Sequence, residues 1–326
     1  MRYVKNIAKA AISISLLLYL IIKADPQKVI DVLLGINSLA GFSYLGLGLL
    51  FTVLAVGLMS LRWQVLLKFY GSQIEFSRLM GFYLIGMFFN NFLPTSIGGD
   101  VMRIYKVNQD TNDRTVSFAS VIIERMLGIA ATLLLAIVAL FLVSQRFHSR
   151  RLLITSVVLF VAIIAFFALI IHNRPFKIIL HLFDKFTFFN IGEKFNKLFE
   201  AIHHFSARRR VLGYAFLFSI SSQISIVLMN YFVARALGLN IDLSYLLMVV
   251  PVTFVLTMLP SINGVGIRDL GYVSLLNRIG VPDAAALSLS FMNLVLPMIL
   301  SIWGAVLFIV QKKKDVGGAD AIETTH

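Results

Sequence analysis

Long apolar runs separated by short polar segments dominate the chain. Six of them approach or exceed the roughly 20 residues that a helix needs to cross the hydrocarbon core of a bilayer. Each therefore predicts a full transmembrane helix. The first resembles a signal peptide, but no small-residue cleavage site follows it, so we interpret it as a retained helix. The six runs are 7–23, 42–61, 116–144, 152–171, 211–235 and 285–310.

Two further apolar stretches, 79–107 and 243–278, are interrupted near their middle by proline and glycine. Proline removes a backbone donor and clashes with the preceding turn, whereas glycine permits conformations closed to other residues. In hydrocarbon every backbone polar group needs a partner, so such a break is tolerated only inside protein or beside a wet cavity. The breaks read Leu93-Pro94-Thr95-Ser96-Ile97-Gly98-Gly99-Asp100 and Leu259-Pro260-Ser261-Ile262-Asn263-Gly264-Val265-Gly266.

Lysine and arginine set the orientation, because they are enriched in cytoplasmic loops. Both termini carry such clusters, and the segment 172–210 carries eight cations, so all three are expected in the cytoplasm. Six spans then alternate correctly only if each broken segment enters and leaves on one side, the first from the cytoplasm and the second from outside. Arg146, Arg150 and Arg151 fall outside in this arrangement and count against it. The alternative makes both broken segments full spans and places 172–210 outside.

These assignments predict an all-α integral membrane protein of the cytoplasmic membrane. It has about six full transmembrane helices and two oppositely oriented re-entrant broken-helix hairpins, which is the pattern of an inverted repeat. We expect residues 1–310 to form a single polytopic domain with both termini in the cytoplasm. Within it, 172–210 is a cytoplasmic amphipathic segment suited to the headgroup layer. Residues 311–326 are expected to form a short disordered cytoplasmic tail.

Composition narrows the classes of function. The chain is 59% hydrophobic and 14% charged, whereas soluble domains are about half apolar and a quarter charged. Its net charge of +13 indicates anionic lipid headgroups rather than nucleic acid, because the cations lie between apolar segments. The chain has no cysteine, which excludes disulfides and thiolate metal sites. No nucleotide-binding loop, metalloprotease helix or nucleophile elbow appears, so we expect no enzyme, no cofactor and no metal.

Charged residues at membrane depth identify the candidate site. Asp100 and Arg103 are three residues apart and suited to one helix face, while Glu124 and Arg125 lie inside the span 116–144. A charge at mid-depth costs about 2.5–3.5 kcal/mol, so such residues form ion pairs or contact a substrate. Both interpretations of Glu124-Arg125 stay open. One helical stripe is small or polar throughout and is expected to face protein or water: Ser117, Ser120, Glu124, Gly128 and Ala131.

The half-helices that follow the two breaks would present free N–H groups and a positive dipole end, which suit a lipid phosphate. The span before the second break adds Ser221, Ser222, Gln223 and Asn230. We therefore expect a substrate-binding and translocation site without catalytic residues. It comprises Asn91, Pro94, Thr95, Ser96, Gly98, Gly99, Asp100, Arg103, Glu124, Arg125, Pro260, Ser261, Asn263, Gly264, Gly266, Arg268 and Asp269.

The stretch from Asn90 to Arg103 resembles the first motif of the transmembrane region of lysylphosphatidylglycerol synthases, a family often called flippase-like. Glu124-Arg125-Met126-Leu127-Gly128 is similar to its second motif and 259–269 to its third, in which Asp269 stands where glutamate is common. Lysyl-transferring members carry a large C-terminal catalytic domain, whereas this chain stops at 326. The resemblance therefore implies the flippase-like part without aminoacyl transfer.

The resemblance implies a flippase that moves a phospholipid, a polyprenyl-phosphate-linked lipid or a related envelope lipid. Arg103, Arg125 or Arg268 would lie near the phosphate, and neighbouring carboxylates would pair with them or bind a driving proton or cation. The alternatives are an integral-membrane glycosyl or aminoacyl transferase, a non-lipid secondary transporter and a structural subunit of an envelope complex. The expected partners are membrane lipids with an anionic headgroup. A homo-oligomer or a partner enzyme that modifies the lipid stays open.

Overall fold

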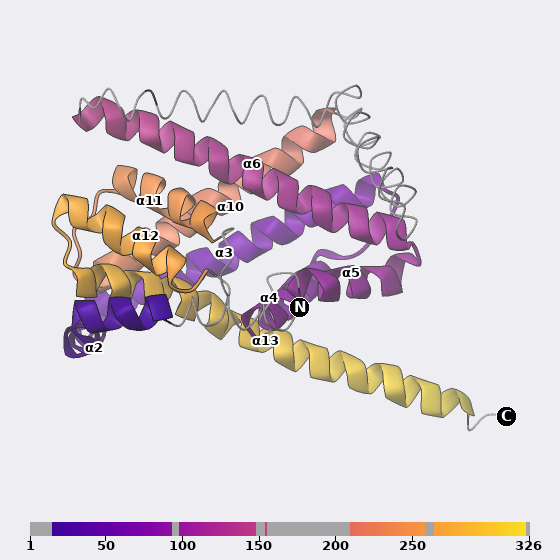
Figure 1. Cartoon of the computed structure of the whole chain (residues 1–326). Coiled ribbons are helices and arrows are strands. Elements are labelled where there is room, and N and C mark those ends of the chain that lie inside the picture. Colours follow the sequence, from indigo (N-terminus) through magenta and orange to yellow (C-terminus); the bar gives the residue numbers. More distant parts are fainter. Residues whose placement is uncertain (1–14, 93–97, 148–153, 155–208, 258–263, 324–326) are drawn as a thin grey trace, which may run out of the picture.

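The computed structural model describes residues 15–92, 98–147, 154, 209–257 and 264–323, and most of these are helical, with no strand among them. The chain is an all-α membrane protein, as its hydropathy predicts (Figure 1). The elements are the helix Ser15–Ala24, α2 (Pro26–Leu34), α3 (Leu39–Phe69), α4 (Phe76–Phe92), α5 (Gly98–Thr111), α6 (Arg114–Phe147), α10 (Arg209–Ala236), α11 (Leu243–Leu256), α12 (Ile267–Leu276), the 3₁₀ turn η1 (Asn277–Ile279) and α13 (Asp283–Glu323).

Within the described ranges, four helices are long and apolar enough to cross a bilayer: Leu39–Phe69, Arg114–Val143, Arg210–Ala236 and Asp283–Gln311. They contain four of the six predicted spans. The end of the first predicted span is described as the helix Ser15–Ala24. The predicted span 152–171 and nearly all of the amphipathic segment 172–210 lie outside the described residues.

The first broken segment folds into an antiparallel pair of helices, α4 and α5. At its open end Arg78 Nη2 lies 2.5 Å from Asp110 Oδ1. Near the break, the Gly99 N–H donates to Asn90 Oδ1 at 2.8 Å. A Cβ built on Gly99 would stand 2.1 Å from a carbonyl oxygen of α4, so only glycine allows the two helices to approach this closely. The two helices are therefore in contact at both ends, near the break at Gly99 and at their outer ends through Arg78 and Asp110.

The second broken segment folds in the same way from α11 and α12. The Tyr245 hydroxyl donates to the Leu275 carbonyl at 2.7 Å near the outer ends of the two helices. Closer to the break, Gly271 faces Thr253, where an added Cβ would come within 3.0 Å. Gly264, just before α12, has φ +76°, a backbone conformation that favours glycine. Neither 79–107 nor 243–278 is thus one continuous helix.

The two helical pairs occupy opposite ends of the long helix α6. Arg103 of α5 contacts Glu124 near the beginning of α6, whereas Leu247 of α11 lines a cavity with Ala139 near its end. At 1.5 Å per residue, Glu124 and Ala139 are about 22 Å apart. Figure 1 shows the same separation, with α11 and α12 at the left and α5 at the right.

Helix packing repeats between the two halves of the chain. Each half runs long helix, helical pair, long helix: α3, α4–α5 and α6, then α10, α11–α12 and α13. The first helices of the two halves, α3 and α10, pack along each other. The first leg of each pair packs on the last helix of the other half, α4 on α13 and α11 on α6.

Two details differ from the sequence expectation. The helix α2 has no counterpart among the predicted elements; the Asp25 side chain accepts from Gln27 N at 3.2 Å, and Pro26 occupies its first turn, where proline is tolerated. At the other end, α13 continues to Glu323, so residues 311–323 are helical rather than a disordered tail. The lysines and alanines of this segment favour helix and it contains no proline, whereas Gly317 and Gly318 disfavour helix.

Candidate functional site

A buried cluster of charged side chains lies where α3, α5 and α6 meet. We call it the arginine cluster and define it as Arg62, Asp100, Arg103, Glu124 and Arg125. Arg62 is 3% exposed, Arg103 5% and Glu124 1%, although all three carry a formal charge. Charged side chains are seldom buried to this extent unless they are paired. The pairings therefore determine what the cluster can do.

Glu124 joins two arginines from different helices. Its Oε1 pairs with Arg62 Nη2, and its Oε2 accepts from Arg103 Nη1 at 3.0 Å. The hydroxyl of Tyr83 on α4 also donates to Oε1 at 3.3 Å. The carboxylate is thus held by protein groups from three helices. This favours a structural ion pair over direct contact of Glu124 with a substrate.

Arg125 forms a different ion pair from its sequence neighbour. Its Nε pairs with Asp100 Oδ2, and Asp100 Oδ1 lies 3.7 Å from Arg103 Nη1. Adjacent residues of a helix project about 100° apart, so Glu124 and Arg125 reach different partners. The Arg125 side chain is 42% exposed, unlike the rest of the cluster.

Aromatic and small residues fix the two buried guanidinium groups. Arg103 lies 4.2 Å from the ring centroid of Trp63 and 4.1 Å from that of Tyr83, which are cation–π distances. Arg62 Nη1 donates to Ser219 Oγ on α10 at 2.9 Å. A Cβ built on Gly128 would stand 3.2 Å from the same Arg62 nitrogen, so glycine makes room for this side chain.

The arginine cluster has more positive charge and more donors than its described partners use. Among the described residues, three arginines face two carboxylates, a formal charge of +1, and Arg125 is the exposed one of the three. Lys106, also buried, lies one turn beyond Arg103 on α5, with its Nζ 5.8 Å from the ring centroid of Phe308. Among the residues that the structure describes, Arg62 Nε, Arg103 Nε and Arg103 Nη2 are buried without a hydrogen-bond partner. A buried unsatisfied donor costs about 1–3 kcal/mol, more for charged groups, so the cluster is suited to accept an anion.

A second cluster, where α12 meets α13, is neutral. Asp269 is fully buried; its Oδ1 accepts from Arg268 Nη2 at 2.9 Å and from Ser290 Oγ at 2.5 Å, and its Oδ2 accepts from Gly266 N at 2.8 Å. A separate set of neutral side chains joins α12, α13 and α10. Tyr272 donates to Asn230 Oδ1 at 2.8 Å, and Asn293 Nδ2 donates to the same oxygen at 2.9 Å.

The open end of the α4–α5 pair carries a third charged contact. Arg78 and Asp110 form an ion pair there, with the arginine more than half exposed. Partial burial raises the pKa of the Asp110 carboxyl above its ordinary value, although the charge of Arg78 acts in the opposite direction. This contact is neutral overall and lies apart from the arginine cluster.

Comparison with known proteins places the chain in a family. The family described as the lysylphosphatidylglycerol synthase TM region matches residues 6–304 of this chain. The chain belongs to this family. It is similar to the UPF0104 membrane protein PH1989 of Pyrococcus horikoshii, with 24% identity over 330 residues, covering 93% of this chain and 96% of that protein. It is also similar to the UPF0104 membrane protein MJ1595 of Methanocaldococcus jannaschii, with 22% identity, covering 88% of this chain and 89% of that protein.

The three motifs that resemble this family fall into two separate sites in the fold. The first and second motifs supply Asp100, Arg103, Glu124 and Arg125 to the arginine cluster, with Gly98 and Gly99 in the first turn of α5. The third supplies Gly264, Gly266, Arg268 and Asp269 to the neutral cluster. Asn91 donates to Ser301 on α13 at 3.0 Å. The remaining predicted site residues lie outside the described part of the chain: Pro94, Thr95, Ser96, Pro260, Ser261 and Asn263.

The expected free N–H groups of the half-helices are partly occupied. Gly99 N donates to Asn90, and Gly266 N donates to Asp269. Each pair therefore supplies its own side-chain acceptor near the start of its second leg. The arginine side chains, rather than these two N–H groups, carry the unused donors.

Sequence reasoning missed several residues of the arginine cluster's surroundings. Arg62 and Lys106 were not among the predicted site residues, but both are buried. The reason is that α3 continues to Phe69, about two turns beyond the predicted end of its span, which carries Arg62 into the protein. Trp63 and Tyr83 were also missed, since aromatic residues in apolar helices give no separate signal. The predicted polar stripe on α6 is confirmed, because Ser117, Ser120, Glu124 and Ala131 are buried.

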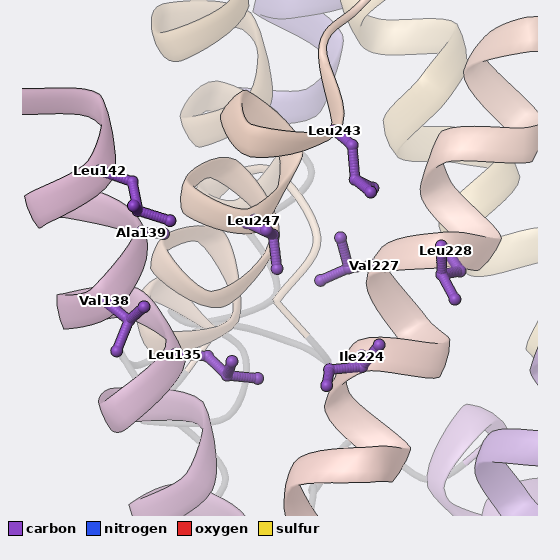
Figure 2. A pocket seen from close by; sticks show the side chains of 9 residues that line it. All are labelled: Leu135, Val138, Ala139, Leu142, Ile224, Val227, Leu228, Leu243 and Leu247. Atoms are coloured by element: carbon purple, nitrogen blue, oxygen red, sulfur yellow. The ribbon is translucent and has the colours of Figure 1, made fainter. Parts of the chain in front are cut away.

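An apolar cavity of about 250 Å³ lies between α6, α10 and α11 (Figure 2). Its lining is aliphatic: Leu135, Val138, Ala139, Leu142, Ile224, Val227, Leu228, Leu243 and Leu247. It offers no hydrogen-bonding side chain, so it is unsuited to a polar headgroup. The charged clusters are therefore the sites where polar chemistry is concentrated.

Proposed function

We propose that this protein is a transporter that moves a lipid with a phosphate-bearing headgroup across the cytoplasmic membrane. The observation that carries the proposal is the arginine cluster. Its buried residues lie on and between helices long enough to cross a bilayer, and within the described part of the chain they have a surplus of positive charge and unused guanidinium donors. Arginine forks bind phosphate in a bidentate manner, so a phosphate would satisfy both the charge and the donors.

The two helical pairs would act as re-entrant hairpins. Support comes from α4 and α5, whose outer ends meet at Arg78 and Asp110. At about 21 Å, α5 is shorter than the hydrocarbon core, and its polar residues do not suit a span. A chain that enters and leaves on one side leaves its broken turn at membrane depth, where neighbouring helices must cover it.

The helix pairing supports an inverted repeat. In each half the first leg of the hairpin packs on the last helix of the other half, and the hairpins lie at opposite ends of α6. Rocking of the two halves along the α3–α10 contact would expose the site first to one face and then to the other. The N- and C-termini are cytoplasmic in this proposal.

Reconstitution into liposomes tests the function directly. The purified protein is incorporated into vesicles that contain a fluorescent phosphatidylglycerol, and the fraction of label exposed to an external quencher is followed with time. We expect the wild type to accelerate exchange and Arg103→Gln to reduce the rate at least tenfold. Arg78→Gln is the matched control, because it removes an exposed arginine outside the cluster. Equal rates with protein-free vesicles, for phosphatidylglycerol and for other phosphate-bearing lipids, would contradict the proposal.

A further inference from the structure

The two buried clusters differ in net charge. In the neutral cluster, Arg268 is balanced by Asp269, which is also bonded to Ser290 and Gly266. At the arginine cluster, Arg62, Arg103 and Lys106, one turn further along α5, are buried, and among the described residues the anions that face them are Glu124 and Asp100. Arg125, which pairs with Asp100, is 42% exposed. Buried charges require partners, so the surplus at the arginine cluster calls for an anion that the neutral cluster does not need.

The carboxylates of the arginine cluster are already engaged. Glu124 uses one oxygen for Arg62 and the other for Arg103, and Asp100 pairs with Arg125 and lies 3.7 Å from Arg103. A ligand that carries an ammonium group would therefore find both acidic side chains bound to arginine. Among the described residues, the buried side-chain donors without a hydrogen-bond partner are all guanidinium nitrogens, of Arg62 and Arg103.

We infer that the headgroup taken by the arginine cluster is a phosphate with no amine to offset its charge. Aminoacylated phospholipids, whose headgroup is net positive, are disfavoured by repulsion from the cluster. This inference rests on the proposed function and narrows its substrate class. The lipid inferred for this chain therefore differs from the lysylphosphatidylglycerol named in the description of its family.

Tryptophan fluorescence offers a readout of binding that does not depend on transport. The chain has two tryptophans. Trp63 is fully buried against the Arg103 guanidinium, whereas Trp303 is 65% exposed. Trp303→Phe therefore leaves one tryptophan that reports on Arg103, because an anion drawn to the guanidinium alters the charge beside the indole ring.

The titration compares three ligands in detergent: short-chain phosphatidylglycerol, its lysyl ester and inorganic phosphate. With Trp303→Phe protein we expect a saturable change for phosphatidylglycerol and at least tenfold weaker binding of the lysyl ester. Inorganic phosphate should require higher concentrations than the lipid. Adding Arg103→Gln should remove the response, whereas adding Arg78→Gln should leave it intact. Equal or tighter binding of the lysyl ester would overturn the inference, and so would phosphate that binds as well as the lipid.

A second variant, Lys106→Gln, tests the inference even if Arg103→Gln does not fold. Lys106→Gln lowers the surplus charge by one without removing a described ion pair. We expect it to weaken phosphatidylglycerol binding several-fold while changing lysyl-ester binding less. A Lys106→Gln protein with unchanged selectivity between the two lipids would count against the charge surplus as the basis of recognition.

Vesicle transport with the same two lipids separates this inference from the proposed function. Transport of the lysyl ester as fast as phosphatidylglycerol would refute the headgroup assignment and leave lipid transport standing. Selective binding of phosphatidylglycerol without transport of either lipid would refute the transport function and leave the headgroup assignment standing.

Discussion

At the scale of single residues, Glu124 holds the arginine cluster together. Because it pairs with both Arg62 and Arg103, its loss leaves two buried guanidinium groups without their main acceptor. Breaking a buried ion pair by removing one partner costs about 3–5 kcal/mol. We therefore expect Glu124→Gln, which keeps the shape but not the charge, to lower the thermal unfolding midpoint in detergent markedly.

The control for this prediction is Arg78→Gln, which disrupts an ion pair whose arginine is largely exposed. Solvent screens the exposed partner of this pair, so the midpoint should change less than with Glu124→Gln. Equal effects of the two substitutions would contradict the central structural role of Glu124.

Gly99 determines how closely the legs of the first hairpin approach. An added Cβ would stand 2.1 Å from the Gly86 carbonyl oxygen, so Gly99→Ala must force α4 and α5 apart. Such overpacking costs about 1–3 kcal/mol and should lower the unfolding midpoint together with phosphatidylglycerol binding. Gly213→Ala on α10 is the matched control, because nothing lies within 4 Å of its added Cβ. A Gly99→Ala protein as stable as Gly213→Ala would contradict the close crossing.

The sequence was sufficient to identify several charged residues of the site but not their ion-pair partners. Asp100, Arg103, Glu124 and Arg125 were predictable, because charges at membrane depth are costly and so indicate pairing or function. Their partners were not, since ion pairing depends on the direction of each side chain across helices. Arg62 was hidden because its position at a predicted helix end is typical of a flanking cation.

At the scale of elements, the two hairpins can be tested by cysteine labelling. The chain contains no cysteine, so single substitutions need no prior removal. Ser77→Cys and Gln109→Cys mark the outer ends of α4 and α5, and Asn240→Cys and Arg278→Cys mark those of α11 and α12; all four positions are exposed. Treatment of intact cells with a membrane-impermeant thiol reagent should modify the second pair and spare the first.

Labelling of the first pair only after membrane permeabilisation would agree with a hairpin that opens to the cytoplasm. If Ser77→Cys and Gln109→Cys instead react from opposite sides, the α4–α5 segment crosses the membrane and the re-entrant assignment is wrong. The same reasoning applies to Asn240→Cys and Arg278→Cys. A reversed result for both pairs would retain the hairpins and invert the proposed orientation.

Elements were predicted better than their packing. The length of the apolar runs identified α3, α6, α10 and α13, because about 20 consecutive apolar residues match the hydrocarbon core of a bilayer. Proline and glycine identified the two breaks, and the distribution of cations predicted that each segment folds back, but neither could show how the two legs pack. That depends on close contacts such as Gly99 against α4 and Gly271 against α11, which join residues on opposite sides of a break.

At the scale of the whole molecule, the two halves have the same order of helices but different electrostatics. The packing of α4 on α13 and of α11 on α6 interlocks the halves, while α3 and α10 form the long contact between them. The surplus charge lies with the first hairpin, and the second hairpin has a balanced cluster. We therefore expect substitutions in the arginine cluster to alter lipid binding, and substitutions in the neutral cluster to alter stability or the rate of exchange.

Lipid exchange in liposomes, measured for wild type, Arg103→Gln and Arg78→Gln, tests the central claim most directly. The expected result is rapid exchange of phosphatidylglycerol by wild type and Arg78→Gln, with at least a tenfold loss for Arg103→Gln in protein that remains folded. Failure of the wild type to move any phosphate-bearing lipid, or equal rates for all three proteins, would contradict the assignment of the arginine cluster as the headgroup site of a lipid transporter.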